Sequence, residues 1–229
     1  MMLKTLFLLG IPVLIAGGCS KPSIQAEDCS ITLNGISFTK SLNQGKSVSQ
    51  LVGANKLIMK SGPKTDYFNE PNQSAKYGNA PMLLTSVDNK SPFTFVTKVS
   101  PQFTQTYDAG ALYIYVDPDK WHKFAYEMDE RKITRLVTVR TSGTSDDNNH
   151  DASTASSVFL KISSDGKQVG FYYSQDSTNW QVTRVYRNDY PETIWLGISA
   201  QSPMGEGNSS AFESCTFSKD AVKDFRMGI

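Results

Sequence analysis

From about residue 30 onward, apolar and polar side chains alternate with a period of two, in segments rich in β-branched and aromatic residues. Gly, Pro, Asn or Asp bounds these segments, and none of them sustains the period of an amphipathic helix. A period of two places the apolar side chains on one face of a strand, so the pattern predicts an all-β protein. The expected strands cover residues 31–37, 51–60, 82–87, 93–99, 111–117, 121–128, 133–141, 158–163, 168–174, 180–186, 193–201 and 211–217.

Short connections join consecutive strands, with turn-forming residues at 117–119 and 164–166. Such connections pair strands antiparallel, and about a dozen strands close over one core as two packed sheets. We therefore expect a sandwich or jelly roll. Residues 60–80 and 141–157 are less regular and polar. Long loops on a sandwich often carry ligand contacts, although mobility alone accounts for them equally well.

The first 18 residues have the organisation of a signal peptide. Lys4 precedes an apolar run at 6–15 that is too short to span a bilayer comfortably. Small residues at 16–18 lead into Cys19, which resembles the lipobox cleaved by lipoprotein signal peptidase. We expect lipidation of Cys19, with ordinary secretion and a free cysteine as the alternative.

A lipidated Cys19 carries more than one acyl chain, which gives stable membrane anchoring. Ser20, in place of Asp, resembles the outer-membrane sorting signal of lipoproteins. Residues 19–28 are polar enough to form a short tether. We expect a lipid-anchored protein of the cell envelope, on the periplasmic side of the outer membrane.

Residues 29–229 match the size of one large sandwich domain, and no long linker or repeat divides them. Cys29 and Cys215 lie near the two ends of this domain, in a compartment that permits disulfides. We expect them to pair and to hold the first strand beside the last. The alternative is two buried free thiols.

The charge balance and the absence of certain motifs limit which classes of partner and cofactor we expect. The chain has 23 Lys and Arg against 22 Asp and Glu, scattered without a basic stripe, so we expect no nucleic-acid partner. No phosphate-binding glycine loop or zinc pattern is present, so we expect no cofactor. Residues 145–151 offer oxygen ligands for Ca²⁺, but their spacing matches no defined calcium loop, and a solvated polar loop is the simpler interpretation. We expect a monomer.

The order of several motifs is that of a known family. The first motif covers residues 107–113, and the second is Trp121-His122-Lys123 with Glu127. Downstream come the element at 171–184 and a Gly-x-x-Ala-x-Ser-Pro strand end at 197–203. Over residues 107–217 the chain resembles a family named after a regulation-of-enolase protein, otherwise of unknown function. The resemblance implies a concanavalin A-like jelly roll, the fold of lectins and glucanases. An exported lipoprotein would not meet a cytosolic glycolytic enzyme, so enolase regulation is not transferred.

A concanavalin A-like sandwich binds sugars on a concave sheet, through aromatic rings and convergent polar side chains. On the strand at 121–128, Lys123 and Glu127 share one face. On the preceding strand, Tyr113 and Tyr115 lie opposite the apolar row and face the same groove, although both could be ordinary surface aromatics. The candidate ligand-binding residues are Tyr113, Tyr115, Lys123, Glu127, Tyr173 and Arg184, flanked by Asp146.

Arg184 has apolar neighbours on its strand face and needs a carboxylate or a ligand oxygen to satisfy its guanidinium. An ion pair with Glu127 or Asp146 is the structural alternative to a ligand contact. These residues predict a non-catalytic carbohydrate-binding protein.

Two other functions stay open. A glycoside hydrolase needs paired carboxylates, which Glu127 and Asp129 could supply, but Lys132 stands where laminarinase-type relatives carry a second glutamate. Only two histidines exist, His122 and His150, and neither belongs to a nucleophilic triad pattern. A protein-interaction module of the envelope would instead expose a large apolar patch.

Overall fold

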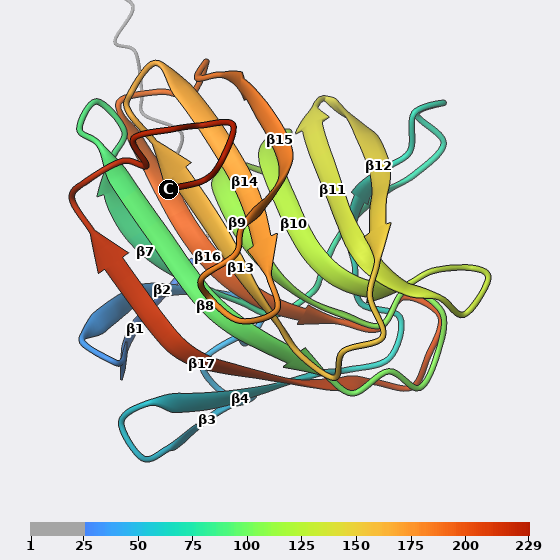
Figure 1. Cartoon of the computed structure of the whole chain (residues 1–229). Coiled ribbons are helices and arrows are strands. Elements are labelled where there is room, and N and C mark those ends of the chain that lie inside the picture. The colour runs from blue at the N-terminus through green and yellow to red at the C-terminus, as the bar shows by residue number, and fades with distance from the viewer. Residues whose placement is uncertain (1–25) are drawn as a thin grey trace, which may run out of the picture.

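The computed structural model describes residues 26–229 (Figure 1). The predicted signal peptide and Cys19 lie outside the described residues. The described part contains seventeen strands and no helix. No helix in residues 26–229 is long and apolar enough to cross a membrane.

Two large antiparallel sheets face each other across the core, which confirms the predicted all-β sandwich (Figure 1). In spatial order the eight-stranded sheet contains β1 (Glu27–Leu33), β2 (Ile36–Leu42), β7 (Met82–Asp88), β16 (Thr193–Gln201), β9 (Ala109–Asp117), β10 (Lys120–Met128), β11 (Thr134–Ser142) and β12 (Thr144–Ala152). The seven-stranded sheet contains β15 (Gln181–Arg187), β14 (Gln168–Ser174), β13 (Val158–Ser164), β8 (Phe93–Pro101), β17 (Asn208–Ser218), β4 (Lys56–Ser61) and β3 (Ser49–Val52). A separate hairpin pairs β5 (Tyr67–Asn69) with β6 (Lys76–Gly78).

Three sequence-based assignments are corrected by local backbone chemistry. The strand expected at 31–37 is a hairpin, because Asn34 and Gly35 both adopt positive φ and turn the chain between β1 and β2. The strand expected at 51–60 is likewise divided, with Gly53 at positive φ between β3 and β4. The irregular segment 141–157 contains β12, an edge strand whose mostly exposed polar side chains hide the alternation.

The main core lies between the sheets and includes Leu112, Ile114 and Phe124. A second apolar cluster lies on the outer face of the eight-stranded sheet, where Tyr113 and Trp121 are fully buried. The middle of this sheet is therefore covered on both faces. The alternation along β9 and β10 assigned these faces correctly.

The predicted disulfide is not formed, since Cys29 and Cys215 are free thiols. The first strand does not lie beside the last, because β1 and β17 belong to different sheets. The Cys29 thiol donates to the Phe38 carbonyl at 3.2 Å, and the Cys215 thiol contacts the Thr97 hydroxyl at 2.9 Å. Each cysteine is satisfied within its own sheet.

Asp108 joins two loops at one end of the sandwich. Its carboxylate is fully buried and accepts hydrogen bonds from the Thr104 amide and hydroxyl, the Gln105 amide and the Ser202 hydroxyl, at 2.6–2.9 Å. A buried carboxylate is stable only when it is satisfied in this way. The two loops that it fixes carry Tyr107 and Met204, which form one wall of the candidate site.

Candidate functional site

A groove of about 510 Å³ lies on the outer face of the eight-stranded sheet. Its floor comes from β10, β11, β12 and the end of β16, including Lys123, Val137 and Gln201. One wall is the β5–β6 hairpin, whose strand β5 contacts β11 and β12. The sequence element expected to be an irregular loop at 60–80 therefore supplies a wall of the site.

The Lys123 ammonium is the centre of the groove's hydrogen-bond network. Although this side chain is only 2% exposed, its Nζ donates to Asp66 Oδ1 at 3.1 Å, to the Tyr67 carbonyl at 3.0 Å and to Gln201 Oε1 at 3.1 Å. Buried charges require paired and hydrogen-bonded partners, and here the hairpin and β16 provide them. The network therefore binds the hairpin to the sheet.

Gln201 passes this network on to Glu127. Its Nε2 donates to Glu127 Oε2 and to the Tyr107 carbonyl, each at 3.2 Å. Burial raises the pKa of Glu127 to about 8, while Lys123 opposes this shift and Asp66 and Asp147 add to it. Glu127 is therefore largely protonated at neutral pH, and its carboxyl group can donate a hydrogen bond as well as accept one.

Aromatic and acidic side chains surround this polar floor. Phe68, Tyr77 and Tyr107 line the groove, and Tyr77 is 45% exposed. Two lysines, Lys64 and Lys123, face five acids. Even with Glu127 protonated, the acids outnumber the lysines, so the groove disfavours anionic ligands. The five acids are Asp66, Glu70, Glu127, Glu130 and Asp147.

The predicted ligand-binding residues divide into three groups. Lys123 and Glu127 line the groove as predicted. Tyr113 and Tyr115 face the same side of the sheet but are covered by the Tyr67 ring, whose centroid lies 5.7 and 6.2 Å from theirs. They support the groove from below, and neither ring is open to a ligand.

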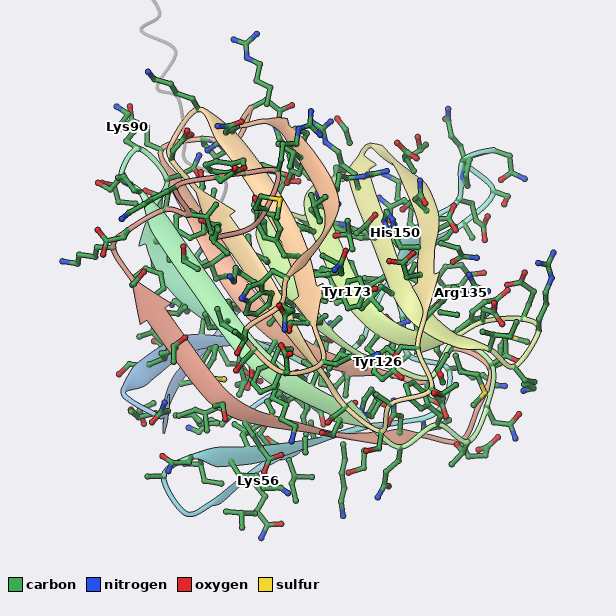
Figure 2. All side chains as sticks on the ribbon, viewed as in Figure 1. Lys56, Lys90, Tyr126, Arg135, His150 and Tyr173 are labelled. Atoms are coloured by element: carbon green, nitrogen blue, oxygen red, sulfur yellow. The ribbon has the colours of Figure 1, made fainter. Side chains whose placement is uncertain are left out.

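Asp146, Tyr173 and Arg184 lie elsewhere, at the edge of the sandwich where β12 faces β14 and β15. Tyr173 donates from its hydroxyl to Asp151 Oδ2 at 2.7 Å and so connects β14 with β12; Figure 2 labels Tyr173 and His150, which lie on these two strands. Within residues 26–229, Arg184 forms no ion pair, so neither alternative partner predicted for it, Glu127 or Asp146, holds it.

Sequence reasoning missed most of the groove's own residues. Asp66, Phe68 and Tyr77 come from the hairpin, which lies far from β10 in sequence, and their only signal was the irregular composition of residues 60–80. Asp147, and not the predicted Asp146, lines the groove, because neighbouring residues of a strand point to opposite faces. Gln201 stood inside the matched strand end but carried no charge to mark it.

Asp129 does not join Glu127 in the groove. It is 1% exposed, its Oδ2 accepts from Arg135 Nε at 2.7 Å, and its Oδ1 accepts from the Arg131 and Ile133 amides. These bonds fix it in the turn after β10. Within the described residues, no group of three His, Cys, Asp or Glu is arranged to hold a metal ion.

The comparisons with known proteins give a family and a fold. Residues 42–220 match the model of a family described as "Protein of unknown function (DUF1349)". No curated protein matches the chain.

A functionally unknown protein from Saccharomyces cerevisiae has a similar structure, with a TM-score of 0.71 and 21% identity over 80% of this chain and 96% of that one. The GH43 protein BlXynB from Bacillus licheniformis has a TM-score of 0.59 and 16% sequence identity, covering 76% of this chain and 35% of that one. The Bacteroides ovatus xyloglucan PUL GH43B has a TM-score of 0.59 and 13% sequence identity, covering 76% of this chain and 34% of that one. The chain spans about a third of these two GH43 proteins, and at such identities the likeness shows the sandwich fold alone.

The raised pKa of Glu127 predicts a pH-dependent stability. Between about pH 4.5 and pH 8 the unfolded chain has this carboxyl ionised while the folded protein keeps it protonated, so stability falls as pH rises through this window. Glu127→Gln removes the effect. As pH rises through this window, we expect the free energy of unfolding of Glu127→Gln to increase by a few kcal/mol relative to that of wild type, measured by urea unfolding at each pH. Glu130→Gln, an exposed change in the same groove, is the control, and parallel pH profiles for wild type and Glu127→Gln would refute the assignment.

Proposed function

Because the chain belongs to the DUF1349 family, whose function is unknown, we propose its function from the groove: it binds a neutral carbohydrate chain without cleaving it. The carrying observation is that the groove combines aromatic side chains with a fixed hydrogen-bonding floor. Sugar rings have apolar faces that stack on aromatic rings and hydroxyls that need convergent polar partners.

The aromatic wall supplies the stacking surfaces. Tyr77 on the hairpin is 45% exposed, and Phe68 and Tyr107 are half-buried beside the groove. The floor supplies the polar partners. Asn149 is exposed, and protonated Glu127 offers a donor to a sugar hydroxyl. The side chains of this floor are held by one another before a ligand arrives, which lowers the entropy lost on binding.

Charge selects among carbohydrates. The excess of acids over lysines repels uronate or sulfated chains and accepts neutral or amine-bearing ones. Xyloglucan is neutral and occurs in the name of one structural neighbour, which makes it the first polysaccharide to test.

Hydrolysis of a glycan is the second candidate, favoured by the raised pKa of Glu127. A carboxyl group that stays protonated near neutral pH is suited to general-acid catalysis. Asp66 is the carboxylate connected to Glu127 through Lys123 and Gln201, and it would have to act as the base or nucleophile.

We also propose that the domain is held at the cell envelope. The support is the sequence alone: residues 1–18 resemble a signal peptide and Cys19 follows a lipobox-like segment. The described domain begins at β1 with Glu27, within the predicted tether of residues 19–28. A short tether of this kind would leave the groove facing the periplasm. The finer resemblance to the regulation-of-enolase-like family likewise stays a prediction.

Glycan binding is tested on the aromatic wall. We expect purified residues 20–229 to bind a neutral polysaccharide on a glycan array, and Tyr77→Ala to weaken the affinity about threefold to tenfold through the lost stacking contact. Phe217→Ala, an exposed aromatic on the seven-stranded sheet, is the matched control and should bind normally. A silent array with folded protein would favour an envelope protein-interaction module instead.

Hydrolysis is tested by incubating each bound polysaccharide with the protein and measuring reducing ends over days. As a binder, the wild type should release no more than Glu127→Gln. Release by wild type that Glu127→Gln and Asp66→Asn both abolish, with binding retained, would establish the second candidate and overturn the first.

The anchor is tested by expressing the full chain in a bacterium fed with radiolabelled palmitate. Wild type should incorporate label and fractionate with membranes, and Cys19→Ala should do neither. Ser20→Ala is a neighbouring control that keeps the cysteine. Equal fractionation of wild type and Cys19→Ala would contradict lipidation at Cys19.

A further inference from the structure

Both lysines of the groove are already engaged. The Lys123 ammonium has three acceptors, and Asp66 is the carboxylate among them. The Lys64 ammonium donates to the Met204 carbonyl at 2.7 Å. Among the described residues, the pair of Lys123 with Asp66 is the only ion pair that joins a groove lysine to a groove acid. The other acids of the groove therefore have no lysine to neutralise them.

Three of these acids reach the groove from separate segments. Glu70 belongs to the hairpin, Glu130 to the turn after β10 and Asp147 to β12. Within residues 26–229, Glu70 and Asp147 take part in no ion pair, and Glu130 has only the exposed Arg131, at 3.9 Å. Like charges that share a concave surface repel one another, and a cation bound among them relieves this repulsion. The groove therefore favours a positively charged group on its ligand.

Glu127 supplies an observation that is independent of this charge balance. It is only 7% exposed and lines the groove, and its Oε2 accepts from Gln201 Nε2 at 3.2 Å. Its other carboxyl oxygen, Oε1, has no hydrogen-bond partner in the described part of the chain. Polar atoms of buried side chains are nearly always satisfied by protein, solvent or ligand, and a carboxyl oxygen accepts in either protonation state. The floor therefore offers this oxygen to a donor on the ligand.

Tyr107 lies beside this carboxyl group. Gln201 Nε2 donates both to Glu127 Oε2 and to the Tyr107 carbonyl, each at 3.2 Å, which places the two residues next to each other. The half-buried Tyr107 side chain lines the groove. Burial raises the pKa of its hydroxyl, and the charge of Glu130 raises it further, so this acid is also near. We call Tyr107, Glu127 and Glu130 the acidic end of the groove.

An ammonium group matches the chemistry of the acidic end. It donates up to three hydrogen bonds, which carboxyl oxygens accept strongly when the donor is charged. The face of an aromatic ring such as that of Tyr107 also attracts a cation. A sugar hydroxyl supplies a single donor and no charge, so it satisfies Glu127 without neutralising Glu130. An amino sugar supplies both within one ring.

We infer that the preferred ligand of the groove is an otherwise neutral carbohydrate chain in which one sugar has a free amino group, and that this ammonium binds at the acidic end. The inference rests on the proposed function, because it specifies which carbohydrate the groove takes. The ammonium binds between Glu127 and Glu130, and the neutral rings of the chain stack on Tyr77 of the hairpin. Acetylation of the amine removes its charge and two of its three donors, so the acetylated chain binds more weakly.

Matched oligosaccharides test this inference. We would measure, by titration calorimetry at pH 6.5, the affinity of purified residues 20–229 for the fully acetylated tetramer of N-acetylglucosamine. The same measurement would be made with each of the four tetramers in which one unit is deacetylated. At least one of these should bind about tenfold more tightly than the acetylated tetramer, and its position locates the acidic end along the chain. Adding salt to about 0.5 M should reduce this preference through screening.

Charge variants separate the acidic end from general attraction to the protein. Glu127→Gln and Glu130→Gln should each reduce the ratio of the two affinities about threefold or more. Glu192→Gln removes an exposed carboxylate that lies outside the groove and should leave the ratio unchanged. Tyr77→Ala should weaken both kinds of tetramer by a similar factor.

The outcomes distinguish this inference from the proposed function. Equal affinities for all tetramers would overturn the inference and leave carbohydrate binding standing. So would a ratio that is unchanged in both Glu127→Gln and Glu130→Gln, or one that falls as far in Glu192→Gln. Binding of a neutral polysaccharide but of no tetramer would also overturn the inference alone. Absence of binding to any carbohydrate would overturn both.

Discussion

The buried ammonium of Lys123 is the interaction on which the groove depends. At 2% exposure on the outer face of the sheet it needs oxygen partners, and it obtains them from the β5–β6 hairpin and from Gln201. Removing one partner of such a buried pair typically costs about 3–5 kcal/mol, because the other is left uncompensated. Satisfying this one charge joins the hairpin to the sheet and places Gln201 where it donates to Glu127.

The alternation of β10 separates two chemistries that are adjacent in sequence. Lys123 and Glu127 face the acidic groove, whereas His122 faces the interior between the two sheets, where its Nδ1 is hydrogen-bonded to the Tyr186 hydroxyl at 2.9 Å. Because side chains of a strand alternate faces, a single strand serves both the charged groove and the uncharged interior. The sheet is thick enough, with side chains buried on each face, to keep the two environments apart.

The sequence supported the all-β class and the faces of β9 and β10, because alternation is a local property. It could not assign strands to sheets. Tyr173 and Arg184 were grouped with Glu127 by their chemistry, yet they belong to the other sheet. For the same reason the predicted pairing of Cys29 with Cys215 was wrong, since their strands belong to different sheets. β12 escaped detection because an edge strand with polar side chains on both faces has no alternation to read.

Whether the groove only binds or also hydrolyses depends on where its second carboxylate stands. Asp147 lies two strands away from Lys123, and Glu127 lies four residues beyond Lys123 on β10. The Cα atoms of Asp147 and Glu127 are therefore roughly 16 Å apart. Side chains on one face stand nearly parallel, so this spacing does not bring the two carboxyls to the roughly 5–5.5 Å of a retaining glycosidase, although Asp147 is close enough to raise the pKa of Glu127. Asp66 also lines the groove, but its Oδ1 lies 3.1 Å from the Lys123 ammonium and serves as the counter-ion of this buried charge. A carboxylate that a buried cation needs as its partner is not free to attack a sugar or to orient a water molecule, and this is the physical reason for preferring binding to hydrolysis.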